Sequence, residues 1–394
     1  MAYHGAYCGA AFLTLTLAPI LTPVLTMPVS AQEVNITYLE RQVIRPPVLS
    51  NLDARPGDLG IAGARLGLGD NASSGKFLGH DYQMNIVRIA PEDSFDPGML
   101  AGADLIVADA PPDDLLALSD ALPGALIFNA SRADNNLRAG DCRANLLHTT
   151  PSDAMLADAL AQFVASRRWE NLALVTGPRP EDEALAESYR QALAKFGLSM
   201  GTEKAWPFEA DLRRSAGAEV PLFTQDLGDY DLLLIADRAD DFARYIAYNT
   251  WLPRPVAGSA GLQAKGWAPV VEQSGAAQLQ SRFHDLAVRD MAPEDFGAWV
   301  AMRSIGEAVM RTGSADAATL RAHILSEEFE LAAFLGRPLS YRGWDGQLRQ
   351  PVPLVTAEAL VAQAPLEGFL HQVNEMDTLG GDSRESECLA FGGE

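Results

Sequence analysis

Two short segments of the sequence have residue types that could do chemistry on a phosphate or an ester. Residues 69–76 (Gly-Asp-Asn-Ala-Ser-Ser-Gly-Lys) look like a phosphate-binding loop, but the glycines are one residue too far apart and Phe77 replaces the required Ser or Thr. The segment also follows a predicted helix, whereas a phosphate-binding loop precedes one. Residues 258–261 (Gly-Ser-Ala-Gly) lack the Gly-x-Ser-x-Gly spacing of a nucleophile elbow. We therefore interpret 69–76 as a helix end followed by a turn, and 258–261 as a connecting loop.

Residues that could bind a metal or move a proton are scattered along the chain. The sequence contains no His-Glu-x-x-His and no Cys-x-x-Cys. The histidines beyond the N-terminal segment stand far apart, at positions 80, 148, 284, 323 and 371. We therefore expect a protein that is not an enzyme and that holds neither a metal nor a cofactor.

A second set of polar residues could bind a small molecule, because most of them directly follow apolar, strand-like runs. Parallel sheets bind ligands beyond the carboxyl ends of their strands, so these side chains are expected to meet there. An arginine would pair with a carboxylate, an aspartate with an ammonium, and a tryptophan with a ring. The candidate ligand-binding residues are Arg41, Asp109, Asn129, Ser131, Arg132, Asp237, Arg238, Ser259 and Trp267.

Three of these candidates also have an ordinary structural interpretation. Arg132 could bind an anionic ligand, pair with nearby Asp134 or lie in water. Asp237 could accept a hydrogen bond from a ligand or cap the helix that starts near Asp240. Trp267 could stack on a ligand or pack in the core.

The elements that would position these residues alternate between strand-like and helix-like segments. Continuous apolar runs, typical of strands buried on both faces, occur at 104–108, 125–128, 172–176 and 231–236. Apolar residues at helical spacing occur at 58–72, 113–121, 152–168, 276–288 and 293–312. Repeated strand–helix units predict an α/β fold with parallel sheets, and the two series of units predict two lobes. With 394 residues, the chain is long enough for two cores.

Residues 1–31 are predicted to be a secretory signal peptide. Residues 9–27 are nearly all apolar or Thr, and 29–31 (Val-Ser-Ala) offer the small residues that a signal peptidase reads, so we expect cleavage after Ala31. No Lys or Arg precedes the apolar run. A membrane anchor is the alternative, but Pro19 and Pro23 interrupt the run and Pro28 directly follows it. Lipid attachment through Cys8 fits poorly, because Cys8 precedes the run.

The predicted mature chain keeps two cysteines, Cys142 and Cys388. In an oxidising compartment such a pair predicts a disulfide, which would fasten the C-terminal tail to the body of the protein. The alternative is two free thiols, one buried and one on a mobile tail.

The charge of the chain narrows its partners. The net charge is −22, from 52 acidic and 30 basic residues. Such a surface repels nucleic acid and anionic lipid, so we expect neither as a partner. The overall content of 48% hydrophobic and 21% charged residues is typical of a globular protein rather than a disordered one.

The layout over residues 34–370 resembles the periplasmic leucine/isoleucine/valine-binding protein family, the type I solute-binding fold. Several short strings are similar to the subgroup of that family found with alcohol dehydrogenase systems that depend on pyrroloquinoline quinone (PQQ). The strings that carry this narrower resemblance are 38–41, 70–71 with 75–79, 128–130, 137–138, 142–145 with 148–149, 151–152, and 385–386 with Cys388.

The resemblance implies two doubly wound parallel-sheet lobes joined by three crossovers, near 149–151, 258–266 and 336–343. Each of these stretches has Gly or Pro nearby, as suits a hinge. The first lobe would comprise 33–150 and 266–337, and the second 151–265 and 338–375. Residues 376–394 would form a C-terminal tail.

The resemblance also implies where a ligand would be held. In amino-acid-binding members, hydroxyls after the third and fourth strands hold the substrate carboxylate, and an acid in the second lobe holds its ammonium. Here 109–112 (Asp-Ala-Pro-Pro) follow the third strand without a hydroxyl, and Arg132 stands beside Ser131 where a small hydroxyl residue is expected. A branched-chain amino acid is therefore disfavoured, and a carboxylated or aromatic solute is expected instead.

The function implied by the resemblance is that of a periplasmic substrate-binding protein of an ABC transporter, which captures a small solute linked to PQQ-dependent alcohol oxidation. Its expected partners are the ligand and the membrane subunits of the transporter, and the expected state is a monomer. The alternative is a ligand-sensing or scaffold protein that contacts a periplasmic dehydrogenase or a signalling partner.

Overall fold

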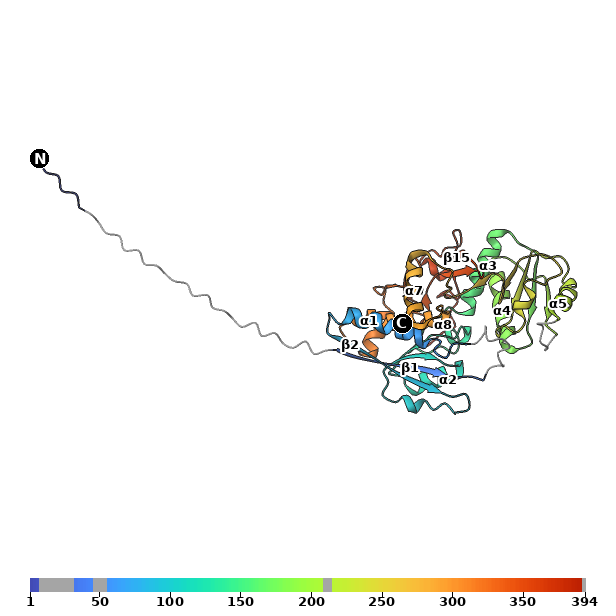
Figure 1. The fold of residues 1–394 in the computed structure, drawn as a ribbon, viewed down its shortest axis with the longest axis horizontal. Coiled ribbons are helices and arrows are strands. Elements are labelled where there is room, and N and C mark those ends of the chain that lie inside the picture. The colour runs from blue at the N-terminus through green and yellow to red at the C-terminus, as the bar shows by residue number, and fades with distance from the viewer. Residues whose placement is uncertain (7–31, 45–54, 208–214, 392–394) are drawn as a thin grey trace.

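The computed structural model describes residues 1–6, 32–44, 55–207 and 215–391 (Figure 1). Two parallel β-sheets organise these residues, and each sheet with its helices forms one lobe. The greater part of the predicted signal peptide, with its cleavage site after Ala31, lies outside the described residues. No helix in the described ranges combines the length and the hydropathy needed to span a bilayer.

The first lobe is built on a sheet with the strand order β2-β1-β3-β4-β5, and all of its pairs are parallel. Helix α2 (Pro112–Ala121) covers one face of the sheet. The other face is covered by α1 (Ile61–Gly75), α7 (Ala276–Ala287), α8 (Pro293–Thr312) and α9 (Ala317–Ile324). The strands are β1 (Gln32–Arg41), β2 (His80–Ile89), β3 (Leu105–Asp109), β4 (Leu126–Asn129) and β5 (Leu146–His148).

Close packing of α1 against α8 fixes the helical face of the first lobe. Helix α8 starts with Pro293 in its first turn, which suits the fixed backbone angle of proline, and ends at Gly313 in the left-handed conformation. Gly63 lets the two helices approach, because a Cβ there would lie 1.9 Å from the carbonyl oxygen of Asp295. The segment 69–76 forms the end of α1 and the following turn, as predicted.

The second lobe is built on a parallel sheet with the order β7-β6-β8-β9. Helices α3 (Asp153–Arg167) and α4 (Pro180–Lys195) cover one face, and α5 (Ala216–Gln225) and α6 (Ala243–Ile246) cover the other. Both sheets are thus wound on both faces, as the sequence predicted. The strands are β6 (Leu172–Thr176), β7 (Thr202–Ala205), β8 (Leu232–Ala236) and β9 (Val256–Gly258).

Two small antiparallel sheets contain the remaining strands of the described residues. One has the order β10-β14-β15, from β10 (Gln263–Ala264), β14 (Val352–Val355) and β15 (Leu360–Ala364). The other has the order β11-β12-β13, from β11 (Leu331–Ala332), β12 (Pro338–Tyr341) and β13 (Leu348–Arg349). Four short 3-10 helices complete the described elements, η2 (Pro97–Leu100), η3 (Asn135–Arg138), η4 (Gln273–Gly275) and η5 (Glu375–Thr378).

The third passage between the lobes differs from the prediction. It was expected near 336–343, which would assign 338–349 to the second lobe. In the structure, Leu339, Tyr341 and Leu348 are buried in the core of the first lobe, and Val352 is the next residue that joins the core of the second. The glycines at 336 and 343 flank a short strand on the first lobe instead of forming a hinge. The passage therefore involves β14, whose Val352 and Leu354 are buried in the second-lobe core and whose Val355 is buried in the first-lobe core.

Candidate functional site

A groove of about 1060 Å³ runs between the two lobes. On the first lobe it is lined by the start of α2 and by the segment that follows β4. On the second lobe it is lined by the start of α3, one face of α4, and Arg238. Residues 342–347 and the C-terminal segment close its far end. The lining includes Asp113, 131–139, Asp141, 152–154, Asp158, Glu181, Ser188, Lys195, Arg238, Trp344 and 385–387.

The first-lobe wall is shaped by Asn129, the last residue of β4. Its side-chain oxygen accepts hydrogen bonds from the backbone amides of Ser131 (3.2 Å) and Arg132 (2.8 Å). Its amide nitrogen donates to the carbonyl oxygen of Arg132 at 2.8 Å. This turn presents both Ser131 and Arg132 to the groove, since asparagine readily bonds the backbone two and three residues ahead.

Arg138, at the end of η3, supports the same wall from behind. The guanidinium is buried and donates to the carbonyl oxygens of Arg132 (2.8 Å), Asp134 (2.9 Å) and Thr150 (3.1 Å). It also donates to the side-chain oxygen of Gln347 at 2.9 Å. Burial lowers the pKa of Arg138 to about 10, which leaves it charged at neutral pH. One buried cation therefore fixes the groove wall to two of the passages between the lobes.

Two polar side chains on this wall have atoms without a hydrogen-bond partner among the described residues. The hydroxyl of Ser131 is buried and has no hydrogen-bond partner among the described residues. Arg132 donates from Nε to the carbonyl oxygen of Ala110 at 3.0 Å, and no described residue bonds its two terminal nitrogens. A buried, unpaired hydroxyl is unfavourable, and an arginine held at Nε still offers donors suited to a carboxylate.

The second-lobe wall carries a buried carboxylate that is paired with an arginine. Asp153 begins α3, is buried, and pairs through Oδ2 with Arg238. Its other oxygen has no hydrogen-bond partner within the described ranges. Burial raises the pKa of the Asp153 carboxyl, although Arg238 opposes this shift. Burial alone would lower the pKa of Arg238, but the paired Asp153 raises it above its ordinary value.

The two lobes touch each other at this groove. Asn135 on the first lobe donates from Nδ2 to the hydroxyl of Ser188 on α4 at 3.0 Å. The amide of Asp153 donates to the carbonyl oxygen of Ala133 at 2.8 Å, and the amide of Ala154 to the side chain of Asn135 at 2.9 Å. The segment after β4 is thus held against the start of α3 and the middle of α4.

Solved structures share this architecture. No protein-family model and no curated protein matches the chain. The branched-chain amino acid ABC transporter periplasmic ligand-binding protein of Burkholderia xenovorans has a TM-score of 0.70 at 15% identity, over 91% of this chain and 100% of that one. The leucine-, isoleucine-, valine-, threonine- and alanine-binding protein of Brucella ovis, in its closed conformation, has a TM-score of 0.65 at 15% identity, over 86% and 93%.

A third similar structure is the solute-binding protein of an ABC transporter from R. palustris, in complex with benzoate. Its TM-score is 0.60 at 13% identity, over 83% of this chain and 94% of that one. This chain has the fold of the type I periplasmic binding proteins. That fold agrees with the α/β, two-lobed architecture predicted from the sequence.

Within the type I binding fold, the predicted ligand residues fall into two groups. Ser131, Arg132 and Arg238 line the groove, and Asn129 shapes its wall from a fully buried position. The other five candidates, Arg41, Asp109, Asp237, Ser259 and Trp267, do not line it.

Two of those five side chains form ion pairs inside their own lobe. Arg41 pairs with Asp114 at 3.1 Å and donates to the carbonyl oxygen of Asp93 at 2.7 Å. Asp109 is buried beside the guanidinium of Arg55, at 3.5 Å.

Asp237 has the capping role that the sequence left open. Its Oδ2 accepts from the amides of Phe242 (2.7 Å) and Ala243 (2.9 Å), at the start of α6. Ser259 accepts a hydrogen bond from the amide of Asp237 at 2.8 Å and thereby holds the same turn. These two residues therefore serve the helix start rather than the groove.

Trp267 contradicts the expectation that it lines the cleft. Its side chain is fully buried in the first-lobe core and stacks on Phe296, with ring centroids 4.6 Å apart. Its indole nitrogen donates to Gln280 at 3.4 Å. The large apolar ring packs into the core instead of lining the groove.

Sequence reasoning missed Asp153, Asn135 and Trp344 as residues of the groove. Asp153 is the second residue of the predicted helix 152–168, so its place at a helix start was predictable, but its position at a cleft was not. Trp344 lines the far end between Arg342 and Arg349, whose guanidinium carbons lie 5.4 and 5.1 Å from the ring centroid. Among the residues that the structure describes, no group of His, Cys, Asp and Glu is arranged to hold a metal.

Proposed function

We propose that this protein is the periplasmic substrate-binding component of an ABC transporter, without catalytic activity of its own. A small solute would enter the groove and contact both lobes, and the lobes would close on it. Closure is favoured because the ligand makes its second set of contacts only in the closed state. The proposal extends to the location, since the fold neighbours are periplasmic proteins and the N-terminal segment is predicted to be a signal peptide.

One observation carries this proposal. Unused polar groups face one groove from both lobes: the Ser131 hydroxyl and the Arg132 terminal nitrogens on one side, and Asp153 on the other. Buried polar atoms are normally hydrogen-bonded, so unused ones that converge on a groove favour a ligand that pairs with them. Their positions after β4 and at the start of α3 are those where two such lobes face each other.

We propose a carboxylate as the ligand class. Arg132 is the groove cation whose terminal nitrogens are unpaired within the described part of the chain, whereas Arg238 is already paired with Asp153. Among the fold neighbours, one is described as a leucine complex and another as a benzoate complex. A planar carboxylate matches the fork of an arginine side chain, and the nearby Ser131 hydroxyl could supply a further hydrogen bond.

The sequence strings similar to the PQQ-associated subgroup point to a narrower ligand. We propose that the solute is linked to PQQ-dependent alcohol oxidation, as an aromatic or aliphatic acid or as the quinone itself, which is a polycarboxylate. The groove volume of about 1060 Å³ is large enough for any of these.

Calorimetry tests the ligand class. The purified protein is titrated with benzoate, an aliphatic acid, pyrroloquinoline quinone, leucine and the uncharged analogue benzamide. At least one non-amino-acid carboxylate should bind, and Arg132→Ala should weaken it by at least about tenfold, because a hydrogen bond to a charged group contributes roughly 1.5–3 kcal/mol. Ser131→Ala should weaken binding less.

The control is Arg65→Ala, which removes the same charge from an exposed position on α1 and should leave the affinity unchanged. Equal binding of benzoate and benzamide would contradict a carboxylate site. Binding of leucine alone would contradict the narrower proposal. No binding of any solute, together with a stable complex with a periplasmic dehydrogenase, would favour the scaffold alternative.

A further inference from the structure

The C-terminal segment is fastened at one end to the second lobe. Leu379 is fully buried in the core of that lobe. The amide of Gly380 donates to Asp158 on α3 at 2.7 Å. Lys195, the last residue of α4, donates to the carbonyl oxygens of Thr378 (2.9 Å) and Gly380 (2.8 Å) and pairs with Asp158 at 2.7 Å. This anchor therefore combines apolar burial, hydrogen bonds and an ion pair.

A second contact fixes the same end to residues 342–349, the segment that leads from the first-lobe core to the third passage. Asp377 accepts hydrogen bonds from the buried guanidinium of Arg342 at 3.2 Å and from Arg349 at 2.7 Å. Both arginines belong to the stretch that leads into β14. The start of the tail is therefore bound into the hinge region and is not a loose end.

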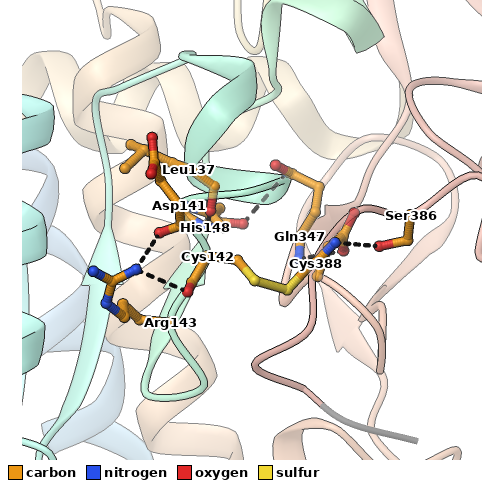
Figure 2. Close-up of a disulfide and its surroundings, with 9 residues drawn as sticks. Leu137, Asp141, Cys142, Arg143, His148, Gln347, Ser386 and Cys388 are labelled. Carbon is orange, nitrogen blue, oxygen red and sulfur yellow. Dashed lines mark hydrogen bonds between the residues drawn. A yellow bond between two sulfur atoms is a disulfide. The ribbon is translucent and has the colours of Figure 1, made fainter.

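The other end of the segment is fastened to the first lobe. Cys388 forms a disulfide with Cys142, in the loop between η3 and β5, as the sequence predicted (Figure 2). Beyond it, Phe391 packs against the first-lobe core, and the guanidinium of Arg321 lies 5.5 Å from its ring centroid. The tail thus runs from one lobe to the other and ends in a covalent bond.

Between these anchors, residues 381–387 pass along the groove. Gly381 and 385–387 form part of its wall, together with Gln191 and Lys195 of α4 and Asp141 of the first lobe. The segment is not extended, because the amide of Glu385 donates to the carbonyl oxygen of Asp382 at 3.0 Å and closes a turn. Cys388 donates its amide to the hydroxyl of Ser386 at 3.2 Å. The ends of this segment are therefore closer together than they would be in a fully extended chain.

The length of this segment limits how far its two ends can separate. Eight residue steps separate Gly380 from Cys388, and an extended chain spans roughly 3.3–3.6 Å per residue, so these two points can separate to at most about 29 Å. Backbone rotation at the crossovers lets the lobes move apart. A segment that joins the lobes and ends in a disulfide stops this opening once the segment is fully extended.

We propose that residues 381–388 are a disulfide-closed strap, a fourth connection between the lobes that limits how far the groove can open. The strap also supplies part of the groove wall, so breaking the disulfide would both widen the opening and loosen that wall. This inference rests on the proposed function only in assuming that the lobes open and close.

The test measures lobe separation without any ligand. Donor and acceptor dyes are placed by noncanonical amino acids at Glu92 on the first lobe and Tyr248 on the second, two exposed positions outside the groove. Single-molecule energy transfer then compares the oxidised protein with Cys142→Ser/Cys388→Ser. A third protein combines Cys142→Ser with truncation after Gly381, which keeps the second-lobe anchor and deletes the strap.

Both variants should show a larger population of widely separated lobes than the oxidised wild type. A thiol reductant should produce the same shift in the wild type and none in the double serine variant. An unchanged distribution of lobe distances in either variant overturns the strap. A lowered melting temperature with unchanged lobe distances also overturns it, because the disulfide would then stabilise the fold without limiting the opening of the lobes. A shift in separation without any solute binding would keep the strap and reject the proposed ligand function.

Discussion

Arg138 and Arg143 stand five positions apart on the first lobe, and their surroundings differ sharply. Arg138 is buried and bonded to three carbonyl oxygens and to Gln347. Arg143 forms an ion pair with Asp120 at 2.6 Å, and the two side chains are 32% and 57% exposed. The pair of residues separates the effect of a buried cation from that of a surface ion pair.

Arg138→Met should lower the free energy of unfolding by about 2–5 kcal/mol, because it leaves several buried carbonyl oxygens without donors. Arg143→Met should change it by at most about 1 kcal/mol, as is usual for an exposed ion pair. Urea unfolding measures both. Similar losses in the two variants would contradict the supporting role assigned to Arg138.

His148 gives the protein a pH dependence at residue scale. Its ring is fully buried, with Nδ1 3.0 Å from the amide nitrogen of Asn129 and Nε2 3.1 Å from the carbonyl oxygen of Leu137. Burial, followed by the nearby charge of Arg138, holds the pKa of His148 well below its ordinary value of 6.5. The unfolded chain therefore binds a proton near pH 6.5 while the folded protein does not.

This difference destabilises the fold as the pH falls below 6.5, down to the folded pKa, and has no effect well above it. Between pH 7.5 and 5.5, the wild type should lose about 1.4 kcal/mol more stability than His148→Gln, one pH unit below the unfolded pKa being worth that amount. Urea unfolding of both proteins at the two pH values measures it. Parallel losses would show that His148 is protonated in the folded state.

Residue types predicted part of the site and missed the rest for a physical reason. Ser131, Arg132 and Arg238 follow strand ends and do line the groove. Asp109 and Arg41 also follow strand ends, but each has an oppositely charged partner from elsewhere in its lobe, Arg55 and Asp114. Such partners arrive through tertiary packing, which sequence spacing does not reveal.

At the scale of elements, helix α1 carries a matched pair of glycines. Gly63 is buried against α8, and an added Cβ would lie 1.9 Å from the Asp295 carbonyl oxygen. Gly69 is exposed, and nothing lies within 4 Å of an added Cβ. Both are helical, so their different surroundings, and not their helix propensity, distinguish them.

Gly69→Ala should stabilise the protein by about 0.5–1 kcal/mol, because glycine loses more conformational freedom in a helix than alanine. Gly63→Ala should destabilise it by about 1–3 kcal/mol, since the two helices must move apart to admit the methyl group. Thermal unfolding of the two variants measures the effects. A stabilised Gly63→Ala would contradict the close approach of α1 and α8.

Long, strongly patterned elements were predictable, and short ones were not. The predicted apolar runs at 172–176 and 231–236 correspond to β6 and β8, and helix 293–312 matches α8. Strands β5 and β9 have three residues each and leave too short a pattern to distinguish from a loop. The helix predicted to start near Asp240 is the short α6, which begins at Ala243 and is capped by Asp237.

At the scale of the whole molecule, the two-lobed plan followed from the repeated strand–helix units, because that pattern constrains sheets strongly. The third crossing was misplaced because glycines mark turns as well as hinges, and only the burial of Tyr341 and Leu348 assigns their segment to the first lobe. The Cys142–Cys388 pairing was predictable from the count of cysteines. Its passage from one lobe to the other was not, since it depends on where Leu379 packs.

The contact between α1 and α8 has a consequence for the order in which the parts of the protein become available during synthesis. Asn71 donates a hydrogen bond to the carbonyl oxygen of Met302, which is 231 positions later in the chain. During synthesis from the N-terminus, α1 is the only helix available to cover this face of the first sheet until α7 and α8 of the described chain have been made. The strands of the second parallel sheet are complete by Gly258. All strands of the second parallel sheet are therefore made before helices α7 and α8 of the first lobe, while the second-lobe core still awaits Val352, Leu354 and Leu379 near the end of the chain.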